Sequence, residues 1–197
     1  MGARIFCIAN QKGGVGKTTS TVNLAAGLAK VGQRVLMIDL DPQGNATMGS
    51  GVDKRKLEHT VYDVLLESAS IAEARVTSQK LIDGGCGYDI LGANRELAGA
   101  EVELVDVERR EKRLKLALAE ADKDYDFVLI DCPPSLSMLT LNGLCCAHGV
   151  IVPMQCEYFA LEGLTDLVNT IKQVHANLNK DLQIIGLLRV MFDPRIT

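Results

Sequence analysis

Hydrophobic residues along the chain alternate between short continuous runs and longer stretches with helical spacing. The runs are typical of strands that are buried on both faces of a parallel sheet, and they lie at 5–9, 34–39, 88–91, 127–130, 149–153 and 182–190. The helical spacing predicts helices at 17–30, 60–67, 101–120, 135–147 and 160–178. A segment rich in Asp, Pro, Gly and Asn, 39–53, predicts a loop. Strands that alternate with helices predict an α/β fold with a mainly parallel sheet.

Length and composition narrow the class of protein. The 197 residues contain no repeat and no linker, so we expect a single domain over 1–197. The net charge of -4 and the 4% of aromatic residues argue against a polycation or a stacking platform for nucleic acid. Six cysteines form no C-x-x-C pair, so we expect buried thiols rather than a zinc site. Without a signal peptide or a membrane-spanning run, the prediction is a soluble cytoplasmic protein.

A glycine-rich loop, Q-K-G-G-V-G-K-T-T from Gln11 to Thr19, joins the first predicted strand to the first predicted helix. Glycines allow backbone N–H groups to turn toward a phosphate, and the helix N-terminus adds partial positive charge. We expect Lys17 to contact the β- and γ-phosphates and Thr18 to bind Mg²⁺. The strict P-loop motif has Gly where Gln11 stands. A dinucleotide fingerprint fits less well, because its last small residue falls on Thr19.

Carboxylates follow two of the predicted strands. Asp39 and Asp41 lie where the second strand ends, and Asp131 lies where the strand at 127–130 ends. The carboxyl ends of parallel strands line the ligand crevice of such folds, so these side chains should face the phosphates. Asp39 and Asp41 are both candidates to orient an attacking water or to bind the metal, and Asp131 is a candidate Mg²⁺ ligand. Cys132, next to Asp131, is expected to fill space rather than to act as a nucleophile.

These motifs together resemble one family of ATPases. K-G-G-V-G-K-T-T resembles the deviant Walker A motif of the ParA/MinD class, D-L-D-P-Q-G-N-A-T resembles switch I of its ParA/Soj branch, and D-C-P-P resembles its switch II. Further similarity at 91–94, 141–144, 150–153 and 160–163 extends the resemblance over essentially the whole chain. It implies a P-loop NTPase fold, with a mainly parallel twisted sheet and helices on both faces.

The resemblance also implies which residues bind ATP or ADP and Mg²⁺. Catalysis is carried over to Lys12, Lys17 and Asp41: Lys12 would reach the partner's nucleotide across a dimer interface, and Asp41 would orient water. The metal ligands would be Thr18, Asp41 and Asp131. Nucleotide contacts would come from the loop and from a residue near the adenine, namely Lys12, Gly13, Gly14, Val15, Gly16, Lys17, Thr18, Thr19 and Met191.

The function implied is ATP hydrolysis in chromosome or plasmid partitioning. The ATP-bound protein would form a nucleotide-sandwich homodimer, bind non-specific DNA on the nucleoid in the cytoplasm, and meet a ParB-type centromere-binding partner, with no membrane partner. Arg195 would lie near a DNA phosphate. Family members continue for roughly a quarter more of their length, so 1–197 is expected to be C-terminally incomplete relative to the family, lacking part of the adenine pocket and much of the DNA-binding surface.

Three alternatives remain open from the sequence. A MinD-like or cellulose-synthesis-type relative would share the ATPase chemistry, although D-P-Q-G-N favours partitioning. A truncated nucleotide-binding module would bind ATP without hydrolysing it. Metabolic phosphoryl transfer or ATP-dependent ligation on a related P-loop fold is the third alternative, and no substrate-specific motif supports it.

Overall fold

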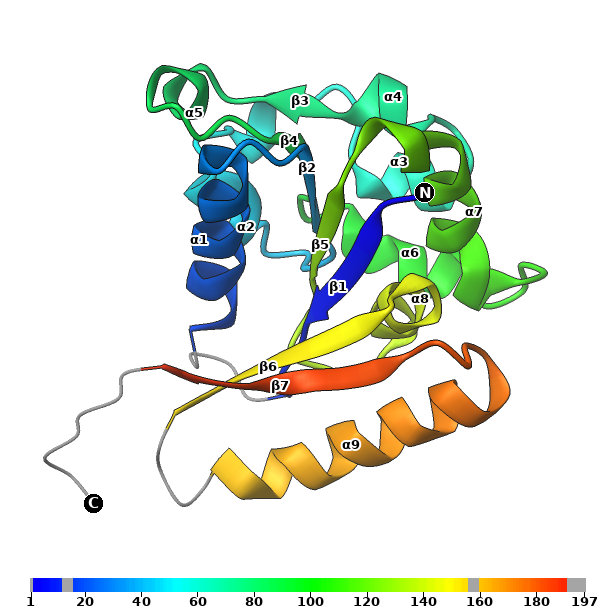
Figure 1. The fold of residues 1–197 in the computed structure, drawn as a ribbon. Coiled ribbons are helices and arrows are strands. Elements are labelled where there is room, and N and C mark those ends of the chain that lie inside the picture. The colour runs from blue at the N-terminus through cyan, green and yellow to red at the C-terminus, as the bar shows by residue number, and fades with distance from the viewer. Residues whose placement is uncertain (1, 12–15, 156–159, 191–197) are drawn as a thin grey trace, which may run out of the picture.

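The computed structural model describes residues 2–11, 16–155 and 160–190. Across these residues one sheet of seven strands has the order β3-β4-β2-β5-β1-β6-β7 (Figure 1). All neighbouring strands are parallel except β3 and β4. The predicted mainly parallel sheet is therefore confirmed. The strands are β1 (Arg4–Ile8), β2 (Val35–Asp39), β3 (Val76–Thr77), β4 (Asp89–Leu91), β5 (Phe127–Asp131), β6 (Gly149–Gln155) and β7 (Gln183–Val190).

Helices cover both faces of the sheet, as the resemblance implied (Figure 1). One face carries α1 (Lys17–Lys30), α2 (Asn45–Gly49) and α5 (Gln79–Asp83). The other face carries the helices α3 (Val61–Leu65), α4 (Ile71–Ala74), α6 (Leu97–Glu103), α7 (Arg113–Ala121), α8 (Met138–Cys146) and α9 (Ala160–Asn177). Three short 3₁₀ turns complete the described elements: η1 (Lys54–Lys56), η2 (Arg110–Lys112) and η3 (Asp122–Asp124).

Two hydrophobic cores, one on each face, explain the continuous apolar runs. Every residue of β2 is buried. Val35 and Met37 belong to the core beneath α1, whereas Leu36 and Ile38 belong to the larger core on the opposite face. A strand covered on both sides needs apolar residues at successive positions, because neighbouring side chains point to opposite faces.

The single helix predicted at 101–120 is wrong. The chain leaves the helical conformation after α6, and Arg109 adopts a left-handed φ of 56°. The buried side chain of Asn142, on α8, fixes the start of α7. Its Oδ1 accepts a hydrogen bond from the Leu114 amide (3.1 Å), and its Nδ2 donates one to the Arg110 carbonyl (2.9 Å). A side chain distant in sequence thus sets the start of α7, overriding the local helical pattern.

Short elements also differ from the sequence expectations. The predicted loop at 39–53 contains α2, which begins after Gly44 in a left-handed conformation (φ 65°). The segment between α3 and β4 contains α4, β3 and α5, none of which the sequence predicted. Elements of two to five residues are too short to display a period of hydrophobic positions.

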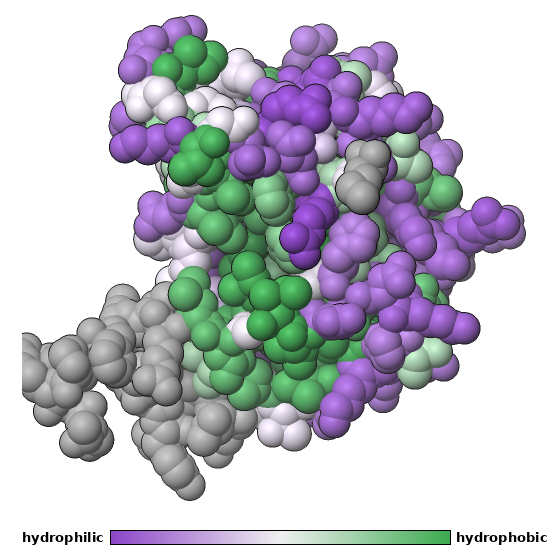
Figure 2. Space-filling model, viewed as in Figure 1, coloured by the Kyte–Doolittle hydropathy of each residue, from purple (hydrophilic) through white to green (hydrophobic). Residues whose placement is uncertain are grey.

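The edge strand β7 exposes several large apolar side chains. Figure 2 shows hydrophobic side chains gathered over the lower centre of this view, where Figure 1 places β6 and β7. The exposed large hydrophobic residues of β7 are Ile184, Ile185, Leu187 and Leu188. Elsewhere, no helix among the described residues combines the length and the apolar character needed to cross a bilayer.

Candidate functional site

The N-terminus of α1 presents the backbone N–H groups of its first turn. Gly16, the residue before the helix, has a left-handed φ of 79°. In the described part of the chain no side chain caps this helix end, and its first turn holds no acidic residue. The first N–H groups of a helix lack partners within the helix, so this end is suited to an anion. Lys12, Gly13, Gly14 and Val15 lie outside the described residues, and their roles stay predictions.

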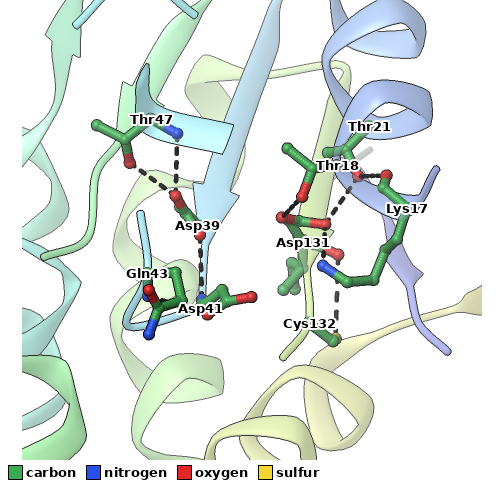
Figure 3. A network of polar contacts seen from close by, with 10 residues as sticks. Lys17, Thr18, Thr21, Asp39, Asp41, Gln43, Thr47, Asp131 and Cys132 are labelled. Carbon is green, nitrogen blue, oxygen red and sulfur yellow. Dashed lines mark hydrogen bonds and ion pairs between the residues drawn. The ribbon is translucent and has the colours of Figure 1, made fainter. Parts of the chain in front are cut away.

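Lys17, the first residue of α1, forms a buried ion pair with Asp131 at the end of β5 (Figure 3). Its Nζ lies 2.8 Å from Asp131 Oδ1. Thr18 Oγ1 donates a hydrogen bond to the other carboxylate oxygen (3.1 Å), whereas the side chain of Thr19 is exposed. One carboxylate therefore holds both residues that the sequence assigned to phosphate and metal.

Thr21 is a member of this cluster that sequence reasoning missed. Its fully buried Oγ1 lies 3.1 Å from Asp131 Oδ1 and 2.9 Å from the carbonyl oxygen of Lys17. A signal was available, because residues four apart on a helix share one face and Thr21 follows Lys17 by four.

Asp39 holds the loop after β2. Its Oδ2 accepts hydrogen bonds from the Thr47 amide (2.9 Å) and hydroxyl (2.8 Å), and its Oδ1 accepts one from the Asp41 amide (3.0 Å). The Thr47 hydroxyl in turn accepts a hydrogen bond from the Ala93 amide (3.0 Å), after β4. Both Asp39 oxygens thus accept hydrogen bonds from the surrounding loop and helix, and a role of Asp39 toward water or metal stays a prediction.

Asp41 lies beside Asp39 and apart from the Lys17 cluster (Figure 3). Its side chain accepts a hydrogen bond from the Gln43 amide (3.0 Å). No hydrogen bond within the described residues joins it to Lys17 or Asp131. Asp39 and Asp131 are register partners on the adjacent strands β2 and β5, so the predicted grouping of carboxylates at one sheet edge is confirmed. The chemical roles of these carboxylates stay predictions.

Burial changes the acidity of both strand-end carboxylates. Burial, and next the negative charge of Asp131, raise the pKa of Asp39 to about 7. Burial also raises the pKa of Asp131, although the Lys17 ammonium and the hydroxyls of Thr21 and Thr18 act in the opposite direction. Ionising both carboxylates at this edge of the sheet therefore costs free energy, and a cation bound here would stabilise their ionised forms.

The donors at this edge fit a magnesium ion that is shared with a phosphate. The Thr18 hydroxyl and the Asp131 carboxylate are the hard oxygen ligands that Mg²⁺ prefers. The described residues contain no group of three or more His, Cys, Asp or Glu side chains that could hold a metal. Mg²⁺ commonly uses one or two protein oxygens together with substrate phosphates and water, so the small donor set is consistent with that mode.

The sequence also made predictions for Met191 and Arg195, as contacts to adenine and DNA, and for the cysteines, as buried thiols. Met191 and Arg195 lie outside the described residues. Cys132 is fully buried, with its Sγ 4.0 Å from the Ile130 carbonyl oxygen. Burial also raises the pKa of the neighbouring Cys7 and Cys146 thiols. Thiols held in the neutral form are poor nucleophiles, which agrees with a packing role.

Comparison with known proteins agrees with this geometry. The model of the AAA domain family matches residues 3–184. The chain is 49% identical over 192 residues to the sporulation initiation inhibitor protein Soj of Bacillus subtilis, spanning 98% of this chain and 74% of Soj. It is 47% identical over 194 residues to the chromosome partitioning protein ParA of Caulobacter vibrioides, spanning 98% and 71%.

A solved structure with the same fold carries a different name. The crystal structure of cobyrinic acid a,c-diamide synthase from Mycobacterium smegmatis with bound ADP and magnesium has a TM-score of 0.93 and 46% identity. It matches 99% of this chain and 77% of that one. The sheet order, the α1 N-terminus and these similarities agree, and the chain belongs to the AAA domain family, in the ParA/Soj group of P-loop NTPases.

Proposed function

We propose that this chain is a ParA-type ATPase that binds and hydrolyses Mg·ATP. The observation that carries the proposal is the convergence of Lys17, Thr18 and Asp131 at the N-terminus of α1. The M. smegmatis structure, with ADP and magnesium bound at 46% identity, supports the choice of ligand. Mg²⁺ at Thr18 and Asp131 would neutralise phosphate charge.

Each side chain then has a distinct part in the reaction. When ATP binds, the Lys17 ammonium leaves the Asp131 carboxylate and binds phosphate oxygens, because the phosphates carry the greater negative charge. Asp41 accepts a hydrogen bond from the attacking water and orients it toward the γ-phosphate. Lys12 of a second protomer adds positive charge to the transition state. Thr21 and Asp39 touch no substrate and act as positioning residues.

The biological role proposed is chromosome or plasmid partitioning. The names of Soj and ParA, at 49% and 47% identity, support it. ATP would favour a homodimer, the dimer would bind non-specific DNA on the nucleoid in the cytoplasm, and a ParB-type partner would stimulate hydrolysis. Ordering of the loop at Asp41 by the γ-phosphate would couple the nucleotide to the dimer face.

Steady-state hydrolysis of ATP tests the proposal. The wild type is expected to turn over Mg·ATP, faster with DNA and a ParB-type protein together. Asp41→Ala is expected to lower kcat about 100-fold, because the variant lacks the carboxylate that orients the attacking water. Asp83→Ala, an exposed carboxylate of α5, is the matched control. Unchanged turnover in Asp41→Ala would remove Asp41 from the mechanism.

ATP-dependent amide ligation is a second candidate, favoured by the name of the M. smegmatis structure. Both reactions would use the same phosphate site, so the acceptor distinguishes them. Ligation predicts ATP consumption that depends on a carboxylic acid and an amide-nitrogen donor and does not respond to DNA. Partitioning predicts ATP consumption that responds to DNA and does not depend on a carboxylic acid or an amide-nitrogen donor.

A further inference from the structure

A pocket opens at the same edge of the sheet, beside the end of β4. Its volume is about 490 Å³, and its lining residues are Lys54, Arg55, Asn94, Arg95 and Glu96. Three of these five side chains are cationic and one is anionic, in a chain whose net charge is -4. None of them belongs to the Lys17 and Asp131 cluster, so the pocket is a separate site.

Four of the five lining side chains carry hydrogen-bond donors, namely Lys54, Arg55, Asn94 and Arg95. Asp53 fixes the Arg55 guanidinium through two hydrogen bonds, from Nε to Oδ1 (3.0 Å) and from Nη2 to Oδ2 (3.3 Å). Asn94 uses its Oδ1 to accept a hydrogen bond from the Glu96 amide (3.0 Å), which leaves its NH₂ group to donate. The exposed Arg95 side chain has no hydrogen bond or ion pair with any residue that the structure describes. A free guanidinium, a fixed one and an amide therefore surround one space.

We propose that this pocket binds a phosphate group. Guanidinium groups bind phosphate oxygens in pairs through parallel N–H donors, and an amide NH₂ adds a further donor. The phosphate can belong to a free anion or to a nucleic-acid backbone, since both present the same oxygens. Three cationic lining side chains face two carboxylates, Glu96 in the lining and Asp53 paired with Arg55, so the pocket stays net positive.

The pocket wall is in direct contact with the loop that carries Asp41. Lys54 Nζ donates a hydrogen bond to the Gln43 carbonyl oxygen. Gly44 packs so closely that a Cβ there would lie 2.6 Å from the Ala93 carbonyl oxygen and 2.8 Å from Lys54 Cδ. Any movement of Lys54 thus acts on the backbone two residues from Asp41.

This contact gives phosphate a route to the ATPase reaction. An ammonium binds an anion more strongly than a neutral carbonyl, so a phosphate in the pocket draws Lys54 away from Gln43. The released Gln43 and Gly44 then allow Asp41 to move relative to the nucleotide site. This regulatory step rests on the proposed ATPase function, whereas phosphate binding itself does not.

Amide NMR on the full 197-residue chain tests the binding. Inorganic phosphate is expected to shift the resonances of Asn94, Arg95 and Glu96, and the same shifts are expected in Lys17→Ala. Arg55→Gln with Arg95→Gln should weaken this binding at least tenfold. Lys30→Gln, an exposed lysine at the far end of α1, is the matched control and should change it less than twofold. Equal affinity in the double variant and the control would overturn the proposal.

A short mixed-sequence DNA duplex distinguishes the two sources of phosphate. If DNA produces the same shifts and the double variant lowers the salt dependence by about two counterions, the pocket reads a nucleic-acid backbone. If only inorganic phosphate produces them, the ligand is a free anion. Absence of shifts with both probes overturns the proposal, whether or not the chain hydrolyses ATP.

The regulatory step has its own readout. In the wild type, phosphate or DNA is expected to change kcat by at least twofold, and Lys54→Met should abolish that response while leaving the shifts at Arg95 in place. If phosphate or DNA still changes kcat in Lys54→Met, the proposed coupling through the Lys54 and Gln43 hydrogen bond is wrong. If no variant hydrolyses ATP, the proposed function fails and the NMR titration still decides the binding.

Discussion

Lys17 and Asp131 form an ion pair in which the lysine side chain is 8% exposed and the carboxylate is 0% exposed. Removing one partner of such a pair leaves an isolated buried charge, which costs about 3–5 kcal/mol. We expect Lys17→Met to lower the free energy of unfolding by about 3 kcal/mol at neutral pH, because protonation of Asp131 offsets part of the cost. Denaturant unfolding measures the change.

A double-mutant cycle provides the control for this pair. Lys17→Met combined with Asp131→Asn should recover most of the lost stability, since no charge then remains buried. If the changes in the free energy of unfolding of the two single variants simply add in the double variant, the two residues are not coupled and the ion pair is refuted.

Thr21 stabilises Asp131 through its hydroxyl. Thr21→Val removes that donor while keeping the shape, and should lower the free energy of unfolding by about 1–2 kcal/mol. Thr21→Ser keeps the hydroxyl and should lose less. Thr19→Val, an exposed position of the same helix, should change stability by less than about 0.5 kcal/mol. Equal losses at Thr19 and Thr21 would argue against the bond to Asp131.

The pKa of Asp39 predicts a pH dependence of stability. Its folded value of about 7 lies above the ordinary value of 3.8, so between these values the folded chain binds more protons than the unfolded chain. Stability therefore falls as pH rises through this window, by about 1.4 kcal/mol per pH unit. From pH 5 to pH 7 the wild type should lose about 2–3 kcal/mol relative to Asp39→Asn, with no further loss above pH 8. Denaturation of both proteins at each pH measures the difference, and a constant difference would refute the assignment.

Asn142 is predicted to control the start of α7. Its buried amide bonds the Leu114 amide and the Arg110 carbonyl, so Asn142→Ala leaves buried polar groups without partners. We expect a loss of about 2–3 kcal/mol and faster hydrogen exchange at the Leu114 amide. Asn177→Ala, an exposed position near the end of α9, is the control. Unchanged exchange at Leu114 would show that the helix begins there without Asn142.

The sequence was sufficient to predict features that depend on local order. Lys17 opens a helix and Asp131 closes a strand, and parallel pairing brings both to one edge of the sheet. The hydrogen bonds of Asp39 were beyond sequence reasoning, because they depend on Thr47, whose hydroxyl also bonds the Ala93 amide 46 residues along the chain. The break before α7 was missed for the same reason, since its cause, Asn142, lies 28 residues beyond Leu114.

Calorimetric titration of the chain with Mg·ATP tests the central claim most directly, with Lys17→Ala as the comparison. We predict saturable binding to the wild type and a loss of at least tenfold in affinity in Lys17→Ala, because the variant lacks the ammonium that meets the phosphates. Equal affinity in the two folded proteins, or no binding to the folded wild type, would contradict the assignment of a nucleotide site to Lys17, Thr18 and Asp131.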